Sequence, residues 1–280
     1  MIEQRAISLI SNNYYDDGNR RVPEAVIERD YCLSWFLFGL ANSPLRELLV
    51  FKGGTALRRC HFQDYRFSED LDFTLTEEKP LEDIIDELDD LFEWVNDESG
   101  IQFGLGKQED PHENNYTFYL TYVGPLPGKE KDVKVDISFR ETLLQPIEEL
   151  PIIQTYDEYT DFIDDVTIKV YSLNEVVIEK ICALHSPSRN EPRDLYDIYY
   201  LTQEEGVEID FLMDDVDEKL QFKGNSLDER RGEFEKKEAR LKKLWEKRLS
   251  AQMVSLPEYD DVFRAVKRTF RQAGLLAAED

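Results

Sequence analysis

Cysteine and histidine are both scarce in this chain of 280 residues. The three cysteines, Cys32, Cys60 and Cys182, are far apart and odd in number. They support neither a disulfide framework nor a zinc site built on cysteine pairs, and they favour a reducing compartment. The three histidines are also too scattered along the sequence to form a metal ligand set.

Long apolar runs are missing as well. The longest nearly apolar stretch, residues 31–41, is too short to cross a bilayer. The first ten residues, MIEQRAISLI, include an early acidic residue and no apolar segment of the kind found in secretory signals. We therefore expect a soluble, cytoplasmic protein without a membrane partner. Apolar residues make up 41% of the chain, which is enough for a core at this length.

Positive charge is in short supply, since 34 Lys and Arg stand against 60 Asp and Glu and the net charge is −26. This balance excludes a uniformly basic nucleic-acid surface and offers no attraction to anionic membranes. Most of the acidity is expected on solvated surface, as in proteins of salt-loving organisms. The segment 223–271 differs, with 14 basic and 9 acidic residues. Within it, residues 230–248 predict a mostly solvated helix with Leu241, Leu244 and Trp245 in one apolar seam.

Two interpretations of this basic segment stay open. The first is a surface helix with internal ion pairs such as Glu233–Lys237 and Glu238–Lys242. The second is a surface that follows the phosphates of a polynucleotide.

Hydrophobic periodicity predicts an α/β N-terminal half and a mainly helical C-terminal half, with a boundary near residue 150. Ser172 and Glu175 form a capping-box pattern that opens the first helix of the second half. The predicted strands cover 48–51, 70–75, 116–122 and 133–139, and the predicted helices cover 24–42, 55–62, 81–95, 172–184 and 193–202.

Three aspartates lie on the predicted strands. Asp70 and Asp72 project to the same side of one strand, about 7 Å apart at their Cα atoms. On a second strand Asp136 points away from the core, together with Lys134 and Ser138. Carboxylates held so close favour a cation between them. Oxygen ligands of this kind suit Mg²⁺, and two such ions would activate an attacking hydroxyl and stabilise a leaving pyrophosphate.

A Gly53-Gly54-Thr55 turn lies between a predicted strand and a predicted helix. Two glycines allow the backbone to approach an anion closely, and the Thr55 hydroxyl and the N–H groups of the next helix add donors. Each motif is a weak signal alone. Their order is much more specific, because the turn is followed by a helix, an Asp-x-Asp strand and a third strand with an aspartate.

The motifs FKGGTAL at 51–57 and YRFSEDLDF at 65–73 closely resemble the AbiEii/AbiGii-type toxin branch of the polymerase-β-like nucleotidyltransferases. Asp136 in VKVDIS corresponds to the third acid of that superfamily. The later Lys motif and Arg-Asp motif of the branch resemble residues 179–183 and 193–197. The resemblance runs from about residue 30 to 202. It departs from the superfamily at Thr55, where Ser is common, and the segment after residue 205 matches no pattern.

The resemblance implies an α+β fold. Residues 1–150 would form a polymerase-β-like nucleotidyltransferase core, a mixed sheet with helices, and 151–280 a mainly helical lobe. It also implies an NTP substrate and two Mg²⁺ ions, with Asp70, Asp72 and Asp136 as the metal ligands.

The resemblance further implies the contacts to the nucleotide. Residues 53–55 would hold the β- and γ-phosphates, and Lys180 would bind a triphosphate oxygen. Asp194 and Asp197 would orient Lys180 or contact the nucleotide. The alternatives are a snorkelling surface lysine at Lys180 and a pair of acids favoured by the helix dipole at Asp194 and Asp197.

The branch implies the toxin of a toxin–antitoxin or phage-defence pair, with an antitoxin encoded nearby. Such an enzyme would transfer a nucleoside monophosphate from an NTP to an acceptor hydroxyl, with the 3′ end of tRNA as the favoured acceptor. Two alternatives stay open. The same fold would modify a protein side chain, by nucleotidylation or phosphorylation, or the chain would be a non-catalytic acidic interaction module. The intact carboxylate and glycine motifs argue against the module.

Overall fold

The computed structural model describes residues 1–18, 21–110, 112 and 114–277. The chain divides into two compact units. Unit 1 comprises Met1–Glu141 and Ile147–Tyr171, and unit 2 comprises Thr142–Pro146 and Ser172–Asp280. Residue 150, near which the sequence suggested a boundary, lies inside a strand of unit 1. None of the helices in the described residues is long and apolar enough to cross a bilayer.

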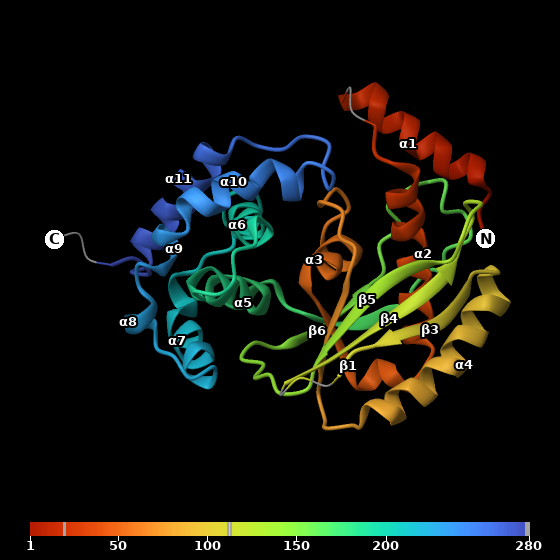
Figure 1. Cartoon of the computed structure of the whole chain (residues 1–280), viewed down its shortest axis with the longest axis horizontal. Coiled ribbons are helices and arrows are strands. Elements are labelled where there is room, and N and C mark those ends of the chain that lie inside the picture. Colours follow the sequence, from red (N-terminus) through yellow and green to blue (C-terminus); the bar gives the residue numbers. More distant parts are fainter. Residues whose placement is uncertain (19–20, 111, 113, 278–280) are drawn as a thin grey trace. The chain divides into compact units, whose positions relative to one another are not determined.

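Unit 1 is built around a mixed sheet (Figure 1), which has seven strands within the described residues and the order β3-β4-β5-β2-β1-β7-β6. The β2–β5 and β1–β7 pairs are parallel, and the other neighbours are antiparallel. The strands are β1 (Leu49–Lys52), β2 (Leu71–Leu75), β3 (Gln102–Gln108), β4 (Asn115–Val123), β5 (Lys131–Ser138), β6 (Ile147–Pro151) and β7 (Thr167–Tyr171). The four predicted strands correspond to β1, β2, β4 and β5, and the α+β fold is confirmed.

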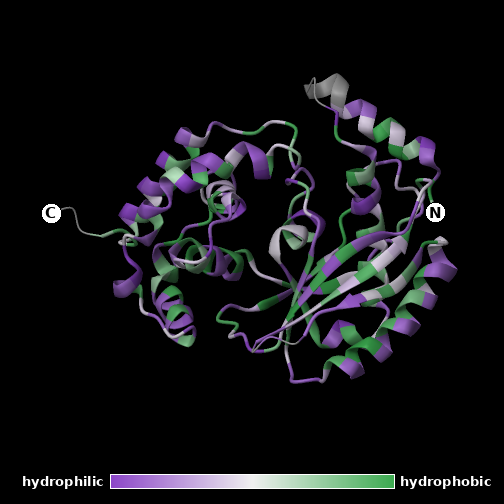
Figure 2. Ribbon diagram, in the orientation of Figure 1, coloured by the Kyte–Doolittle hydropathy of each residue, from purple (hydrophilic) through white to green (hydrophobic). Residues whose placement is uncertain are grey.

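One face of this sheet is apolar, and two helices of unit 1 pack on it. The helices of unit 1 are α1 (Gln4–Gly18), α2 (Glu24–Ala41), α3 (Gly53–Ala56) and α4 (Leu81–Ser99). Phe36 of α2 and Phe92 of α4 both pack on Phe103 of β3. Figure 2 shows that α4 carries both apolar and polar faces, as expected for a helix that buries one side. The opposite face carries mostly polar side chains, among them Lys52, Asp72 and Asp136.

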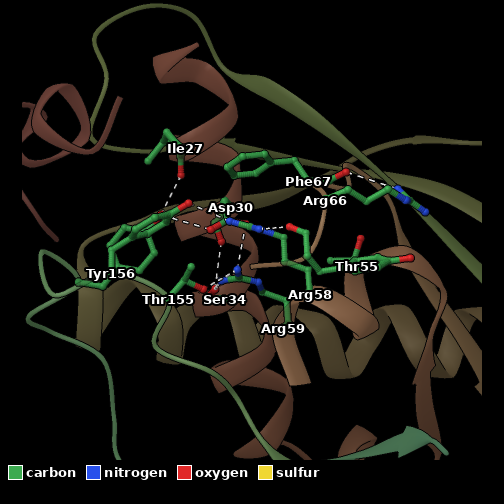
Figure 3. A network of polar contacts seen from close by, with 12 residues as sticks. Ile27, Asp30, Ser34, Thr55, Arg58, Arg59, Arg66, Phe67, Thr155 and Tyr156 are labelled. Carbon is green, nitrogen blue, oxygen red and sulfur yellow. Dashed lines mark hydrogen bonds and ion pairs between the residues drawn. The ribbon is translucent and has the colours of Figure 1, made fainter. Parts of the chain in front are cut away.

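A buried polar network anchors the helix that follows β1 (Figure 3). α3 continues as a π-helical turn, Leu57–His61, which carries Arg58 and Arg59. Asp30 of α2 binds both of them, with its Oδ1 atom 2.7 Å from Arg58 Nε and 3.1 Å from Arg59 Nη2. All three residues are at most 3% exposed. Arg59 also donates to the Thr155 hydroxyl at 2.8 Å. The network therefore ties the segment behind the glycine turn to α2 and to residues further along the chain.

Unit 2 is helical, as the sequence predicts. Its helices are α5 (Leu173–His185), α6 (Pro192–Tyr199), α7 (Met213–Phe222), α8 (Leu227–Arg230), α9 (Glu233–Lys236), α10 (Glu238–Leu249) and α11 (Tyr259–Gln272). In its core Phe234 contacts Phe263 and Phe270. The single helix predicted over 230–248 is wrong, because Gly232 has a φ of +85° and separates α8 from α9. Two of the three predicted seam residues, Leu241 and Trp245, are buried.

The start of α5 differs from its prediction in one respect. Ser172 caps the helix by accepting a hydrogen bond from the Glu175 N–H at 3.4 Å. A capping box would also have the Glu175 carboxylate accept from the Ser172 backbone N–H, and this part of the prediction is wrong. The carboxylate instead binds Lys219 Nζ at 2.7 Å and accepts from the backbone N–H groups of Leu144 and Gln145. The buried Glu175–Lys219 pair therefore holds the segment Thr142–Pro146 in unit 2.

Candidate active site

A row of polar side chains crosses the polar face of the sheet in unit 1. Lys52 of β1 pairs with Asp72 of β2, and Asp72 pairs with Asp136 of β5. Asp136 in turn pairs with Thr117 of β4. Side chains at paired positions share a face, and neighbouring strands lie about 4.8 Å apart. The sheet therefore brings the predicted carboxylates Asp72 and Asp136 side by side, and Asp70 directly precedes β2.

Both carboxylate oxygens of Asp136 accept hydrogen bonds from neighbouring side chains. Its Oδ1 atom accepts from the Thr117 hydroxyl at 2.6 Å and from Asn115 Nδ2 at 3.4 Å. Its Oδ2 atom accepts from Lys134 Nζ at 2.5 Å. Burial alone would lower the pKa of the Lys134 ammonium, but the hydrogen bond to Asp136 and the charges of Asp136 and Asp70 raise it. Negative charge from two of the predicted ligands thus acts on the same ammonium.

The Lys52 side chain reaches the same part of this face from β1, on the other side of β2. Its Nζ atom donates to the Ser138 hydroxyl on β5 at 3.1 Å. Because β2 lies between β1 and β5, the Lys52 side chain must cross β2 to make this bond. The Ser138 hydroxyl then donates to Asn115 Oδ1 at 3.0 Å, and Asn115 also contacts Asp136. Two lysines are therefore built into the polar face that carries the carboxylates.

The glycine turn lies against these carboxylates. Gly53 has a φ of +80°, and a Cβ atom there would be 2.5 Å from Asp72 Oδ2. A Cβ atom on Gly54 would be 2.7 Å from Arg66 Nη2. The Thr55 hydroxyl donates to the Asp70 backbone carbonyl at 2.5 Å, so it links the turn to the start of β2. Only residues without a side chain fit at the two glycine positions without a shift of their neighbours.

The residues present suit a divalent cation whose coordination is completed by substrate. Within the described part of the chain, no three His, Cys, Asp or Glu side chains are arranged to hold a metal ion by themselves. Asp72 and Asp136 nevertheless occupy paired positions, and carboxylate oxygens are the ligands that Mg²⁺ prefers. Mg²⁺ keeps several waters and takes phosphate oxygens from nucleotides. The donor set therefore fits such an ion better than it fits a closed structural metal site.

The motifs of unit 2 form a second, buried cluster. Lys180 Nζ lies 2.8 Å from Asp194 Oδ1 and 2.6 Å from Asp197 Oδ2. The side chains of Asp194 and Asp197 are at most 1% exposed. Asp194 lies in the first turn of α6, where the helix dipole also favours an acid. Lys180 is 12% exposed and is not a snorkelling surface lysine. Burial would raise the pKa of Asp194, but the charges of Lys180 and Arg189 lower it. The cluster holds the Lys180 ammonium in one place.

Lys237 has a role that the sequence did not suggest. The predicted Glu233–Lys237 pair is wrong, because the Lys237 ammonium binds the backbone carbonyls of Ala183 and Leu184 at the end of α5, at 3.2 and 2.6 Å. Burial lowers the pKa of Lys237 to about 8, against the opposing charges of Asp194 and Glu233. Nothing in the local sequence indicates this contact, because the two segments are 53 residues apart.

The exposed side of α10 carries positive charge. Arg240, Lys243 and Lys247 are all exposed and lie at i, i+3 and i+7, on one side of the helix. In the part of the chain that the structure describes, these three cations take part in no ion pair. Their neighbour Lys242 pairs with Asp260 at 2.6 Å, which replaces the predicted Glu238–Lys242 pair. A basic stripe thus persists in a strongly acidic protein.

Comparisons with known proteins concern the fold and the family of this chain. Structures with similar folds include the nucleotidyltransferase toxin MenT4 from Mycobacterium tuberculosis, at 21% identity and a TM-score of 0.64, with 97% of this chain and 90% of that chain covered. JHP933 from Helicobacter pylori gives 17% identity and a TM-score of 0.57, with coverage of 90% and 93%. A search of curated proteins found no match. The family model described as "Nucleotidyl transferase AbiEii toxin, Type IV TA system" matches residues 35–272. The chain therefore belongs to the AbiEii family of nucleotidyltransferase toxins from type IV toxin–antitoxin systems.

Proposed function

We propose that this toxin transfers a nucleoside monophosphate from an NTP to a hydroxyl at the 3′ end of tRNA, with divalent metal held by Asp70, Asp72 and Asp136. The observation that carries this proposal is the pairing of Asp72 with Asp136 beside the Gly53 turn. A nucleotidyltransferase needs carboxylates and a phosphate-binding backbone at one place, and this arrangement supplies both.

In the proposed reaction the acceptor oxygen forms a bond to the α-phosphorus of the NTP. The bond from the α-phosphorus to the oxygen that bridges to the β-phosphate breaks, and pyrophosphate leaves. Asp136 accepts the proton of the acceptor hydroxyl. Mg²⁺ held by Asp70, Asp72 and Asp136, two ions by the family resemblance, would supply positive charge to the transferred phosphoryl group and the leaving pyrophosphate.

Residues 53–55 and Lys180 are proposed to bind the triphosphate. The backbone of the turn approaches the β- and γ-phosphates. This role is supported by the position of Gly53 against Asp72, where a Cβ atom would be 2.5 Å from Oδ2. Lys180 contacts a phosphate oxygen, and Asp194 and Asp197 position its ammonium. In this role the two buried aspartates act through Lys180 and need no contact with the nucleotide.

The acceptor is proposed to be RNA because of the stripe on α10. Arg240, Lys243 and Lys247 are uncompensated cations in a protein with a net charge of −26. Phosphate contacts from such residues supply most of the sequence-independent affinity for a polynucleotide. The non-catalytic alternative is wrong, since the family is one of nucleotidyltransferases, and membership of a type IV toxin–antitoxin family implies an antitoxin partner.

The test of the reaction is incubation of the purified protein with Mg²⁺, total tRNA and each α-³²P-labelled NTP in turn. Label on RNA is the expected result, and label on protein would support the alternative of protein modification. Asp136→Asn should abolish transfer. Asp132→Asn is the matched control, because it removes an exposed carboxylate from the same strand and face. Equal activity of both variants would contradict the catalytic assignment.

The RNA surface has its own test. Replacing Arg240, Lys243 and Lys247 together by Gln should weaken tRNA transfer and leave NTP binding unchanged. The dependence of log affinity on log salt should fall by roughly 0.7 to 0.9 for each lost phosphate contact. The matched control removes the same charge from three lysines that have carboxylate partners, namely Lys236, Lys242 and Lys267. Loss of RNA affinity in both triple variants alike would contradict a specific role for the stripe.

A further inference from the structure

Lys134 occupies an oxygen that the metal would need. It lies two residues before Asp136 on β5, so both side chains project from the same face of the sheet. Its Nζ atom is 2.5 Å from Asp136 Oδ2, and the two side chains are 37% and 22% exposed. The other oxygen of Asp136 is bound by Thr117 at 2.6 Å. Without metal, both oxygens of this proposed ligand therefore already accept hydrogen bonds, and Oδ2 accepts one from an ammonium.

The charges of this face are nearly balanced without any metal. The aspartates at 70, 72 and 136 bring three negative charges, and Lys52, Lys134 and the Arg66 guanidinium beside Gly54 bring three positive charges. The sum is zero, which leaves little electrostatic drive for a divalent ion to bind alone. Two divalent ions would change the sum to +4, and the roughly four negative charges of a bound NTP would return it to about zero.

We propose that Lys134 is a stand-in cation, which holds Asp136 in the absence of metal and releases it only when metal and NTP bind together. The proposal rests on the proposed function, because it takes Asp136 as a metal ligand. Lys134 acts through Asp136 and is a positioning residue. It stabilises the carboxylate row while the site is empty of substrate, and its charge penalises metal binding without the triphosphate. Metal and nucleotide thereby bind as a coupled pair.

The coupling follows from electrostatics alone. An ammonium within about 5 Å of a divalent ion repels it, and at the screening typical of a protein surface the repulsion weakens binding by at least about tenfold. Negative phosphate groups attract the same ammonium. Only after the nucleotide has bound can the Lys134 ammonium exchange Asp136 for a phosphate oxygen. The Lys134–Asp136 pair re-forms when pyrophosphate and metal leave.

The test measures Mn²⁺ binding to the full chain by electron paramagnetic resonance, with and without a non-hydrolysable NTP analogue. Without nucleotide, Lys134→Gln should bind Mn²⁺ at least about tenfold more tightly than wild type. Lys134→Arg keeps the charge and should resemble wild type. The control Lys107→Gln removes a lysine charge that is 73% exposed on β3, and it should have no effect. The analogue should tighten Mn²⁺ binding strongly in wild type and much less in Lys134→Gln.

Asp136→Asn separates this inference from the proposed function. If Asp136→Asn weakens Mn²⁺ binding but Lys134→Gln binds Mn²⁺ within about twofold of wild type, the inference is overturned and the metal assignment stands. If Asp136→Asn binds Mn²⁺ as well as wild type does, both the metal assignment and the inference are overturned. Thermal melts by circular dichroism check that each variant is folded, and the partial exposure of Lys134 favours a folded variant.

Discussion

The substitution Asp30→Asn removes a carboxylate that two buried guanidinium groups share. Burial would lower the pKa of Arg58, but the charge of Asp30 raises it, so Arg58 stays protonated at every pH at which the protein folds. Arg59 binds the same Asp30 oxygen at 3.1 Å and is fully buried. An Asn side chain has the same shape and still offers an oxygen acceptor, but it leaves both positive charges without a counter-ion.

The magnitude follows from the burial of the network. Removing one partner of a buried ion pair costs about 3–5 kcal/mol. The amide oxygen of Asn retains a hydrogen bond worth about 1 kcal/mol. We therefore expect Asp30→Asn to lower the free energy of unfolding by about 3 kcal/mol. For a domain of this size, about 1 kcal/mol corresponds to a change of roughly 2–4 °C in Tm, so Tm should fall by about 6–12 °C.

Differential scanning calorimetry and urea titration measure this loss. Asp261→Asn is the matched control, because Asp261 forms an exposed pair with Arg264 in which the side chains are 73% and 68% exposed. Exposed pairs contribute less than about 1 kcal/mol, so the control should shift Tm by only a few degrees at most. If Asp30→Asn costs no more than Asp261→Asn, the network does not anchor the segment behind the glycine turn, and the argument from burial fails.

Three further predictions concern the turn and unit 2. Gly53→Ala should abolish transfer, because the new Cβ atom displaces the Asp72 carboxylate. It should lower the free energy of unfolding by only about 1–2 kcal/mol, which is the cost of holding an Ala residue at a φ of +80°. Activity that survives at a normal Tm would contradict this prediction. Lys237 has a pKa lowered to about 8, so the unfolded chain keeps its proton to higher pH than the folded chain. The free energy of unfolding of wild type relative to that of Lys237→Met should therefore rise by about 1 kcal/mol from pH 7 to 9.5 in urea titrations, after allowance for solvent screening. A difference that stays constant or falls over this pH range would refute the lowered pKa of Lys237. Asp194→Asn should cost about 3 kcal/mol in the same assay, whereas Arg189→Gln, at a side chain that is 51% exposed, should cost less than about 1 kcal/mol, and equal costs would count against the buried cluster.

Much of the candidate site could be predicted because its signals are local. Alternation along residues 70–75 and 133–139 predicts which side chains leave the core, and β2 and β5 carry them as expected. A glycine turn before a helix is also visible within a few residues. The pairing of Asp72 with Asp136 has no such local signal, because it depends on two strands about sixty residues apart becoming neighbours. The family resemblance supplied that neighbour relation.

The parts that sequence reasoning missed depend on long-range contacts. Glu175 matches a capping box by spacing, yet its carboxylate binds Lys219 and two backbone N–H groups from residues 144–145 instead of the N-terminus of its own helix. Strand periodicity predicts that Lys134 lies on the outward face beside Asp136, but it does not tell whether an outward lysine faces solvent or a carboxylate. The sequence pattern does not reveal the break at Gly232, because Leu227, Phe234 and Leu241 keep a seven-residue apolar spacing across it.

The path of the chain through unit 1 has a consequence for its synthesis. β1, which leads into the glycine turn, lies between β2 and β7 in the sheet. β7 ends at Tyr171, so β1 gains its second neighbour only after about 120 further residues have been made. At 5–20 residues per second, this takes roughly 6–24 seconds on the ribosome. A chain interrupted before Tyr171 lacks that neighbour, so incomplete translation products of this toxin are expected to be harmless to the cell that makes them.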